Sequence, residues 1–235
     1  MLEFTEAFAT AGLLIAALDP ALLEIVALSL RISLSAVAVG TLVGLPVGAA
    51  LAVARFPGRD VLIVCVNALM GLPPVVVGLI VYLHLSNSGP FGSLQLLYTP
   101  AAMIIAQTLL VTPIVVALSR QFVEDANSDY DEELRSLGVI GAAKLVTLIT
   151  EVRYSLFTVV LAAFGRAIAE VGAVIIVGGN INHVTRVMTT AIALETSKGD
   201  LALALALGII LMLLALGVNA AASTVRRFAP RAAYA

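Results

Sequence analysis

Long apolar stretches separated by short polar ones dominate the chain. Five of these stretches are long enough to cross about 30 Å of hydrocarbon at about 1.5 Å per helical residue. They span residues 28–54, 61–85, 96–120, 154–179 and 201–225. A shorter apolar segment, residues 7–18, ends at Asp19-Pro20, which favours a helix lying at the membrane interface. The pattern predicts an all-α membrane protein in which residues 1–235 form one domain with about five transmembrane helices.

Composition agrees with this prediction and excludes several classes of protein. The 235 residues are 61% hydrophobic and 12% charged, with a mean hydropathy of +1.09, so a freely soluble domain is excluded. A net charge of −2 leaves no basic excess for nucleic acid. One cysteine and two distant histidines argue against a disulfide or a metal site, and we expect no cofactor. Because no phosphate-binding glycine loop occurs, any ATP used by this protein must bind to another chain.

The basic residues predict the orientation in the membrane, since short loops rich in Lys and Arg stay in the cytoplasm. With five spans, nine basic residues fall on one side: Arg55, Arg59, Arg120, Arg135, Lys144, Arg153, Arg226, Arg227 and Arg231. Only Arg186 and Lys198 fall in the opposite connections. We therefore expect the N-terminus outside, the C-terminus in the cytoplasm and a cytoplasmic loop at residues 121–153.

Glycine and proline mark special positions inside the predicted spans. Gly40, Gly44 and Gly48 recur every four residues, which lets another helix approach one face closely. This spacing fits either tight packing within the chain or a dimer seam. Pro73 and Pro74 follow Gly71-Leu72 in the second span, where they free backbone carbonyls and predict a break in the helix. The break is either a structural kink or part of an aqueous path.

Charged and polar side chains near the fourth span are the candidates for a transport path. Arg166 and Glu170 are four residues apart, so they either neutralise each other or line a path for an anion. Thr189 and Thr190 lie in a short predicted helix that fits an external gate. The outer-loop side chains of Asn180, Asn182, His183 and Arg186 are either solvated or contact a binding protein.

The cytoplasmic loop is polar in a way that no other segment matches. From Asp131 to Thr150 it predicts two short helices joined near Gly138 and Gly141, where glycine permits a sharp change of direction. Leu134, Leu137 and Val139 give this segment an apolar side. Such a protrusion on a membrane helix bundle is typical of a segment that docks into a soluble partner protein.

The loop resembles the signature of ABC importer permeases, in which Glu-Ala-Ala is followed by three residues and glycine. Glu132 and Gly138 keep this spacing, whereas Glu133 and Leu134 replace the two alanines. Leu148, Thr150 and Glu151 stand where the signature has Ile, Leu and Pro. Downstream, residues 163–181 and 185–211 are similar to the tungstate-type permease subfamily.

This resemblance implies a type I ABC importer transmembrane domain rather than an enzyme. It implies a homodimer in a prokaryotic cytoplasmic membrane, with two cytoplasmic ATPase subunits and an extracytoplasmic oxyanion-binding protein as partners. The residues that would couple the loop to the ATPase are Glu132, Glu133, Leu134, Arg135, Leu137, Gly138 and Val139. The alternatives are a stand-alone secondary transporter or channel, or an ABC permease for molybdate or sulfate.

Overall fold

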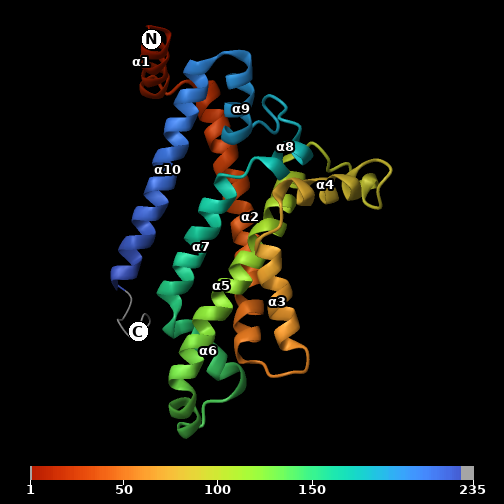
Figure 1. Ribbon diagram of the computed structural model, residues 1–235, viewed down its shortest axis with the longest axis vertical. Coiled ribbons are helices and arrows are strands. Elements are labelled where there is room, and N and C mark those ends of the chain that lie inside the picture. The colour runs from red at the N-terminus through yellow and green to blue at the C-terminus, as the bar shows by residue number, and fades with distance from the viewer. Residues whose placement is uncertain (1, 229–235) are drawn as a thin grey trace. The chain divides into compact units, whose positions relative to one another are not determined.

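The computed structural model describes the backbone of residues 2–228 and the side chains of residues 6–225. Arg231 therefore lies outside the described residues, as do the side chains of Arg226 and Arg227. Within the described chain the elements are α1 (Leu2–Ala16), α2 (Pro20–Val53), α3 (Arg59–Met70), α4 (Pro74–Leu85), η1 (Gly92–Leu94), α5 (Pro100–Ser136), α6 (Gly141–Glu151), α7 (Arg153–Ile168), α8 (Gly172–Gly178), α9 (Met188–Lys198) and α10 (Leu201–Phe228), with no strand among them (Figure 1).

Within the part of the chain that the structure describes, three helices are long and apolar enough to cross a membrane by themselves: Pro20–Val53, Pro100–Ser136 and Leu201–Val225. Two broken helix pairs, α3 with α4 and α6 with α7, raise the number of candidate spans to five if each pair counts as one. The predicted all-α membrane fold is confirmed. The predicted break before Pro74 is confirmed as well, because α3 ends at Met70 and α4 begins at Pro74.

Two predicted helices have different limits in the structure. The separate short helix expected from Asp131 is wrong, because α5 continues to Ser136. The reason is that residues 114–137 contain neither proline nor glycine and include many good helix formers. The fourth apolar stretch is not one helix, since α7 ends at Ile168 and α8 begins at Gly172. The Glu170 side chain accepts the Ala173 amide hydrogen at 3.1 Å, which favours a new helix start there.

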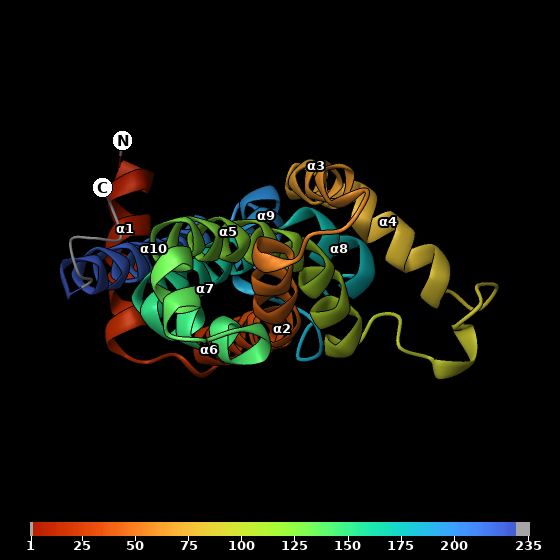
Figure 2. The same cartoon turned by 90° about the horizontal axis from the view of Figure 1, so that it is seen from below.

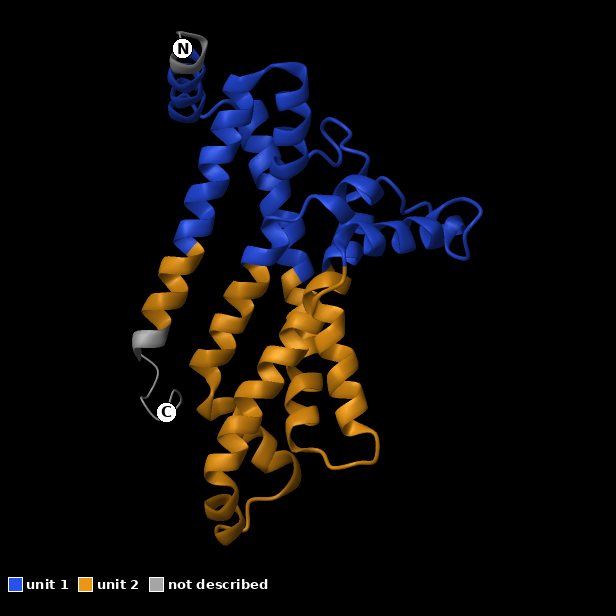
Figure 3. Ribbon diagram, in the orientation of Figure 1, with its two compact units in different colours: residues 1–36, 73–107, 165–217 blue, residues 37–72, 108–164, 218–235 orange. Residues whose placement is uncertain are grey.

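The chain divides into two compact units, shown in different colours in Figure 3. Unit 1 comprises residues 1–36, 73–107 and 165–217, and unit 2 comprises residues 37–72, 108–164 and 218–235. Several helices, among them α2 and α5, contribute residues to both units.

In unit 2, α2 and α5 pack closely through the glycines of α2. A Cβ atom on Gly44 would lie 2.8 Å from the Val115 Cβ, and one on Gly48 would lie 2.5 Å from the Val116 carbonyl oxygen. The interpretation of this spacing as tight packing is confirmed, and the partner helix is α5. Side chains of α2, α5, α6 and α7 then complete one apolar cluster, which includes Ala49, Val123, Leu148 and Leu156.

In unit 1, α4 and α8 lie side by side (Figures 1 and 2). The pair is close because Gly78 has no side chain: a Cβ there would lie 2.7 Å from the Ala173 Cα. The helix α9 is held to α2 by the buried Ser29 hydroxyl, which accepts the Met188 amide hydrogen at 2.8 Å.

Candidate functional site

The chain reverses direction between α5 and α6 through a glycine turn. Gly138 adopts a φ of +70°, a left-handed conformation that glycine reaches without the strain of a side chain. The Val139 amide donates to the Leu134 carbonyl at 2.8 Å, and the Gly138 amide donates to the Arg135 carbonyl at 3.0 Å. These two bonds form the Schellman pattern that ends many helices. We call residues 131–151, on either side of this turn, the elbow.

The elbow is fixed to the rest of unit 2 by apolar packing, and its two arms are joined by an ion pair. Leu134 and Leu148 are buried in the same apolar cluster as Val123 and Leu156. Lys144 of α6 pairs with Asp131 of α5. The hydrogen bond from Lys144 lowers the pKa of the Asp131 carboxyl below its ordinary value, and the positive charge of Arg135 acts in the same direction. The elbow is therefore a braced structure rather than a loose connection.

The outer side of the elbow presents apolar side chains to the surroundings. Leu137, Ile140 and Val146 are 69%, 73% and 63% exposed. Glu132 and Glu133 are also exposed. The expected apolar side is therefore divided, because Leu134 points into the core while Leu137 points out. Ile140 and Val146 were not among the predicted residues, since a sequence pattern alone does not show which face of α6 is covered.

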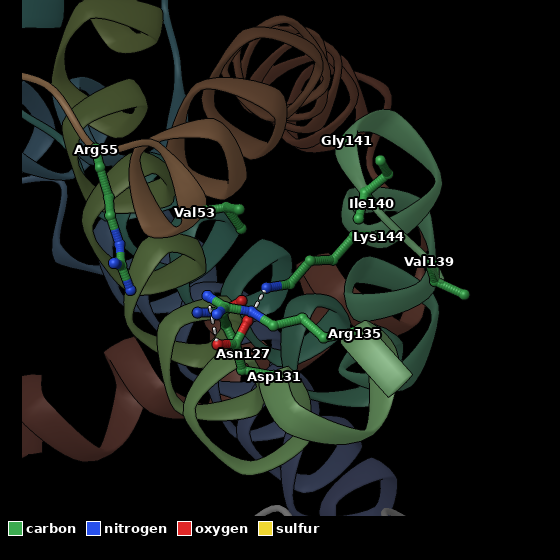
Figure 4. Close-up of a pocket in the computed structure, with 9 residues that line it drawn as sticks. All are labelled: Val53, Arg55, Asn127, Asp131, Arg135, Val139, Ile140, Gly141 and Lys144. Atoms are coloured by element: carbon green, nitrogen blue, oxygen red, sulfur yellow. Dashed lines mark hydrogen bonds and ion pairs between the residues drawn. The ribbon is translucent and has the colours of Figure 1, made fainter. Parts of the chain in front are cut away.

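A pocket of about 370 Å³ lies beside the elbow, and the exposed Ile140 forms part of its lining (Figure 4). Its walls come from the end of α2, from α5 and from the start of α6. It is lined by Val53, Arg55, Asn127, Asp131, Arg135, Val139, Ile140, Gly141 and Lys144.

A second group of charges in unit 2 ties α3 to α2 and α5. The Arg59 guanidinium donates from Nε to the Leu51 carbonyl at 2.9 Å, and its Nη2 lies 2.6 Å from Glu124 Oε1. Glu124 also pairs with Arg120, one turn earlier on α5. Arg59 thus satisfies a carbonyl left free at the end of α2 while it holds the start of α3 to α5.

In unit 1 the predicted pair of Arg166 and Glu170 is present. Arg166 Nη1 lies 2.5 Å from Glu170 Oε2. The Glu170 side chain is only 3% exposed, whereas that of Arg166 is 38% exposed. A carboxylate this deeply buried requires its cation and its hydrogen bonds, because desolvation of an unpaired charge is costly.

Glu170 is the point where α7, α8 and α9 meet. Besides receiving the Ala173 amide hydrogen, it accepts the Thr189 hydroxyl hydrogen at its own backbone carbonyl, at 2.7 Å. Thr190 is buried too, and its hydroxyl accepts the Val187 amide hydrogen at 3.1 Å. The start of α4, just after Pro73 and Pro74, reaches the same region, because a Cβ on Gly172 would lie 2.8 Å from a Val75 methyl group. The structure thus gathers the predicted path residues in one part of unit 1.

The predicted contact residues of the loop after α8 have two different environments. Asn182 and His183 are exposed, and His183 Nδ1 lies 2.8 Å from Glu24 Oε2 of α2. Asn180 donates to the Thr190 carbonyl at 3.3 Å. The Arg186 side chain is 18% exposed and lies 3.7 Å from the buried Glu195. Asn182 and His183 are therefore open to contact, while Asn180 and Arg186 support the loop.

No three His, Cys, Asp or Glu side chains within the described residues gather closely enough to hold a metal ion. The described residues thus present two separate candidate sites: an apolar tip on a braced elbow in unit 2, and a buried ion pair at a helix junction in unit 1.

The sequence matches known transport proteins over most of its length. The family model of the binding-protein-dependent transport system inner membrane component matches residues 40–229. A probable anion ABC transporter permease of Haloferax volcanii is 42% identical over 214 residues, covering 89% of this chain and 92% of the relative. A tungstate uptake system permease of Peptoclostridium acidaminophilum is 40% identical, with 92% and 94% covered. A sulfate transport system permease of Escherichia coli is 30% identical, with 75% and 63% covered.

Proposed function

Because the chain belongs to the family of binding-protein-dependent transport system inner membrane components, we propose that it is the permease of an ATP-driven oxyanion importer. Tungstate is the substrate that we favour, since the tungstate uptake permease matches almost the full length of both chains. Sulfate and molybdate are the alternatives within the same class, because all three are tetrahedral dianions and a sulfate permease is a more distant relative.

The permease works as a homodimer with two ATPase subunits on the cytoplasmic side and a binding protein on the outside. The N-terminus faces outward and the C-terminus faces the cytoplasm, as the distribution of basic residues favours. In this orientation the elbow projects into the cytoplasm, and the loop that carries Asn182 and His183 faces the binding protein.

The elbow transmits movement of the ATPase to the transmembrane helices. Leu137, Ile140 and Val146 form an apolar tip that fits a groove on a soluble partner. The root of the elbow packs on α2, α5 and α7 through one close-packed cluster. Because such clusters resist compression, a push on the tip displaces these helices together instead of being absorbed locally. The braced elbow with its exposed apolar tip is the observation that carries this proposal.

Elbow variants test the docking step. Leu137→Glu and Val146→Glu place a charge on the apolar tip at residues that do not line the pocket, so we expect loss of ATPase co-purification with the permease, while the permease itself remains in the membrane. Leu94→Glu makes the same kind of change at a residue that is 58% exposed in unit 1, and it should retain the ATPase. Retention of the ATPase by both elbow variants would remove the tip from the docking surface.

A substitution at the turn tests coupling separately from docking. Gly138→Trp forces a large side chain into a left-handed position, which should change the angle of the elbow. We expect this variant to assemble in the membrane but to lose substrate-stimulated ATP hydrolysis, measured with ATPase and loaded binding protein. Wild-type stimulation in this variant would exclude the turn from the coupling mechanism.

A further inference from the structure

The pocket beside the elbow is lined mainly by charged and polar side chains. Asn127, Asp131 and Arg135 follow one another every four residues, so they share one face of α5 and line one wall. Arg55 reaches the pocket from the α2–α3 loop, and Lys144 reaches it from α6 (Figure 4). Its volume of about 370 Å³ falls in the range of small-molecule sites, which is about 300–1,000 Å³.

The pocket carries an excess of positive charge. Three cations, Arg55, Arg135 and Lys144, line it together with one carboxylate, Asp131. Asp131 already pairs with both Arg135 and Lys144. Arg55 has no ion-pair partner among the described residues, and the Arg135 side chain is 63% exposed. Two positive charges therefore remain available to an anion that enters.

A buried polar atom adds a second requirement for the occupant. The Asn127 Oδ1 atom is buried and has no hydrogen-bond donor among the described residues. Such an acceptor is costly to leave unsatisfied, so an occupant with an O–H group would stabilise the pocket. The occupant that fits both features is anionic and carries a hydrogen-bond donor, which a phosphate group supplies as a hydroxyl.

The place of the pocket along α2 adds a third requirement. Val53 is the last residue of the apolar α2 and forms part of the wall, directly before the cationic Arg55. The pocket therefore lies where an apolar membrane helix ends, and basic pockets at this level between helices bind lipid headgroups. Val53, Val139 and Ile140 provide apolar surface beside the charges.

From these observations we propose that the elbow pocket binds a phosphate group that carries a free hydroxyl, with Arg55 and Arg135 as its main cationic contacts. Either the headgroup of an anionic phospholipid or free hydrogen phosphate provides this chemistry. An occupant would join the α2–α3 loop to the elbow and so stiffen the elbow. The inference does not depend on the transported substrate or on the ATPase.

Binding to the full-length permease in a neutral detergent tests the proposal. The probes are dioctanoyl phosphatidylglycerol, dioctanoyl phosphatidylcholine and inorganic phosphate, each titrated while binding is followed by calorimetry and by the midpoint of thermal unfolding. We expect saturable binding of phosphatidylglycerol, of inorganic phosphate or of both, and none of the zwitterionic phosphatidylcholine. Binding of phosphatidylglycerol alone assigns the site to a lipid headgroup, and binding of inorganic phosphate alone assigns it to a soluble source.

Charge-removing variants locate the binding in the pocket. Arg55→Gln and Arg135→Gln each remove a cation but keep the pair of Asp131 and Lys144 intact. Each should weaken binding about fivefold, since one basic residue near an anionic surface contributes about 1 kcal/mol. Arg153→Gln removes an exposed cation outside the pocket and should bind like the wild type. Absence of binding by both phosphate-containing anions, or unchanged binding in the Arg55→Gln/Arg135→Gln double variant, would overturn the proposal.

Discussion

At the scale of single residues, the buried Glu170 of unit 1 connects three helices. Glu170 is almost fully buried, and it uses its carboxylate for Arg166 and for the start of α8 and its backbone carbonyl for Thr189. Arg166 keeps partial access to its surroundings. The two partners are therefore unequal, because the glutamate depends on the arginine more than the arginine depends on the glutamate.

This inequality predicts an order of stability among three variants. Arg166→Gln leaves a buried carboxylate without its cation and should lower the midpoint of thermal unfolding more than Glu170→Gln does. The double variant should recover part of the loss, with a coupling of about 0.5–3 kcal/mol. Midpoints measured in nanodiscs check this order. Strictly additive losses would show that the two side chains do not stabilise each other.

Sequence spacing predicts ion pairs within one helical turn better than ion pairs between residues that are far apart in the sequence. Arg166 and Glu170 are one helical turn apart, so their ion pair could be predicted. Asp131 and Lys144 are 13 residues apart, and only the reversal at Gly138 brings them together. The same holds for Arg59 and Glu124, which are 65 residues apart and whose pairing depends on how α3 packs against α5.

At the scale of helices, the glycine face of α2 sets how closely α5 can approach. Gly40, Gly44 and Gly48 meet Val111, Val115 and Ser119, each one turn further along α5. The spacing predicts that another helix packs closely on this face, but it does not identify that helix. The structure shows that the helix is α5 of the same chain.

A matched pair of glycine substitutions tests this packing. Gly48→Ala places a methyl group against backbone atoms of α5 and should destabilise the protein by about 1–3 kcal/mol. Gly208→Ala lies in α10, where the new Cβ meets nothing within 4 Å beyond its chain neighbours and its own helix backbone, so it should be neutral or stabilising by up to about 1 kcal/mol. Thermal unfolding compares the two variants. Equal effects would contradict the close approach of α2 and α5.

Helix ends could be predicted where glycine or proline interrupts the helix, but not where a side-chain hydrogen bond fixes the boundary. The break before Pro74 and the turn at Gly138 follow from backbone chemistry alone. The start of α8 is favoured by the Glu170 side chain, which accepts the Ala173 amide hydrogen, and a run of apolar residues does not reveal this bond. The continuity of α5 was missed because a hydropathy pattern ends the membrane span where the polar residues begin, so the helix from Asp131 was predicted as a separate one although no helix breaker directly precedes it.

At the scale of the whole molecule, the homodimer is the part of the proposal that a distance can test. Cys65 on α3 is exposed and is the only cysteine in the chain, so a spin label attaches at one position. A twofold dimer predicts one dominant distance between labels in nanodiscs, because both copies place Cys65 equivalently. Cys65→Ala is the control without signal. The absence of any dipolar interaction between the spin labels would contradict the proposed homodimer.

The central claim is that the chain moves an oxyanion only when an ATPase drives it through the elbow. Uptake of tungstate into proteoliposomes tests this claim most directly, with the permease reconstituted alone, with its ATPase, and with the ATPase and binding protein together. We predict uptake only when ATPase, ATP and loaded binding protein are all present. Transport by the permease alone, without nucleotide, would contradict the claim.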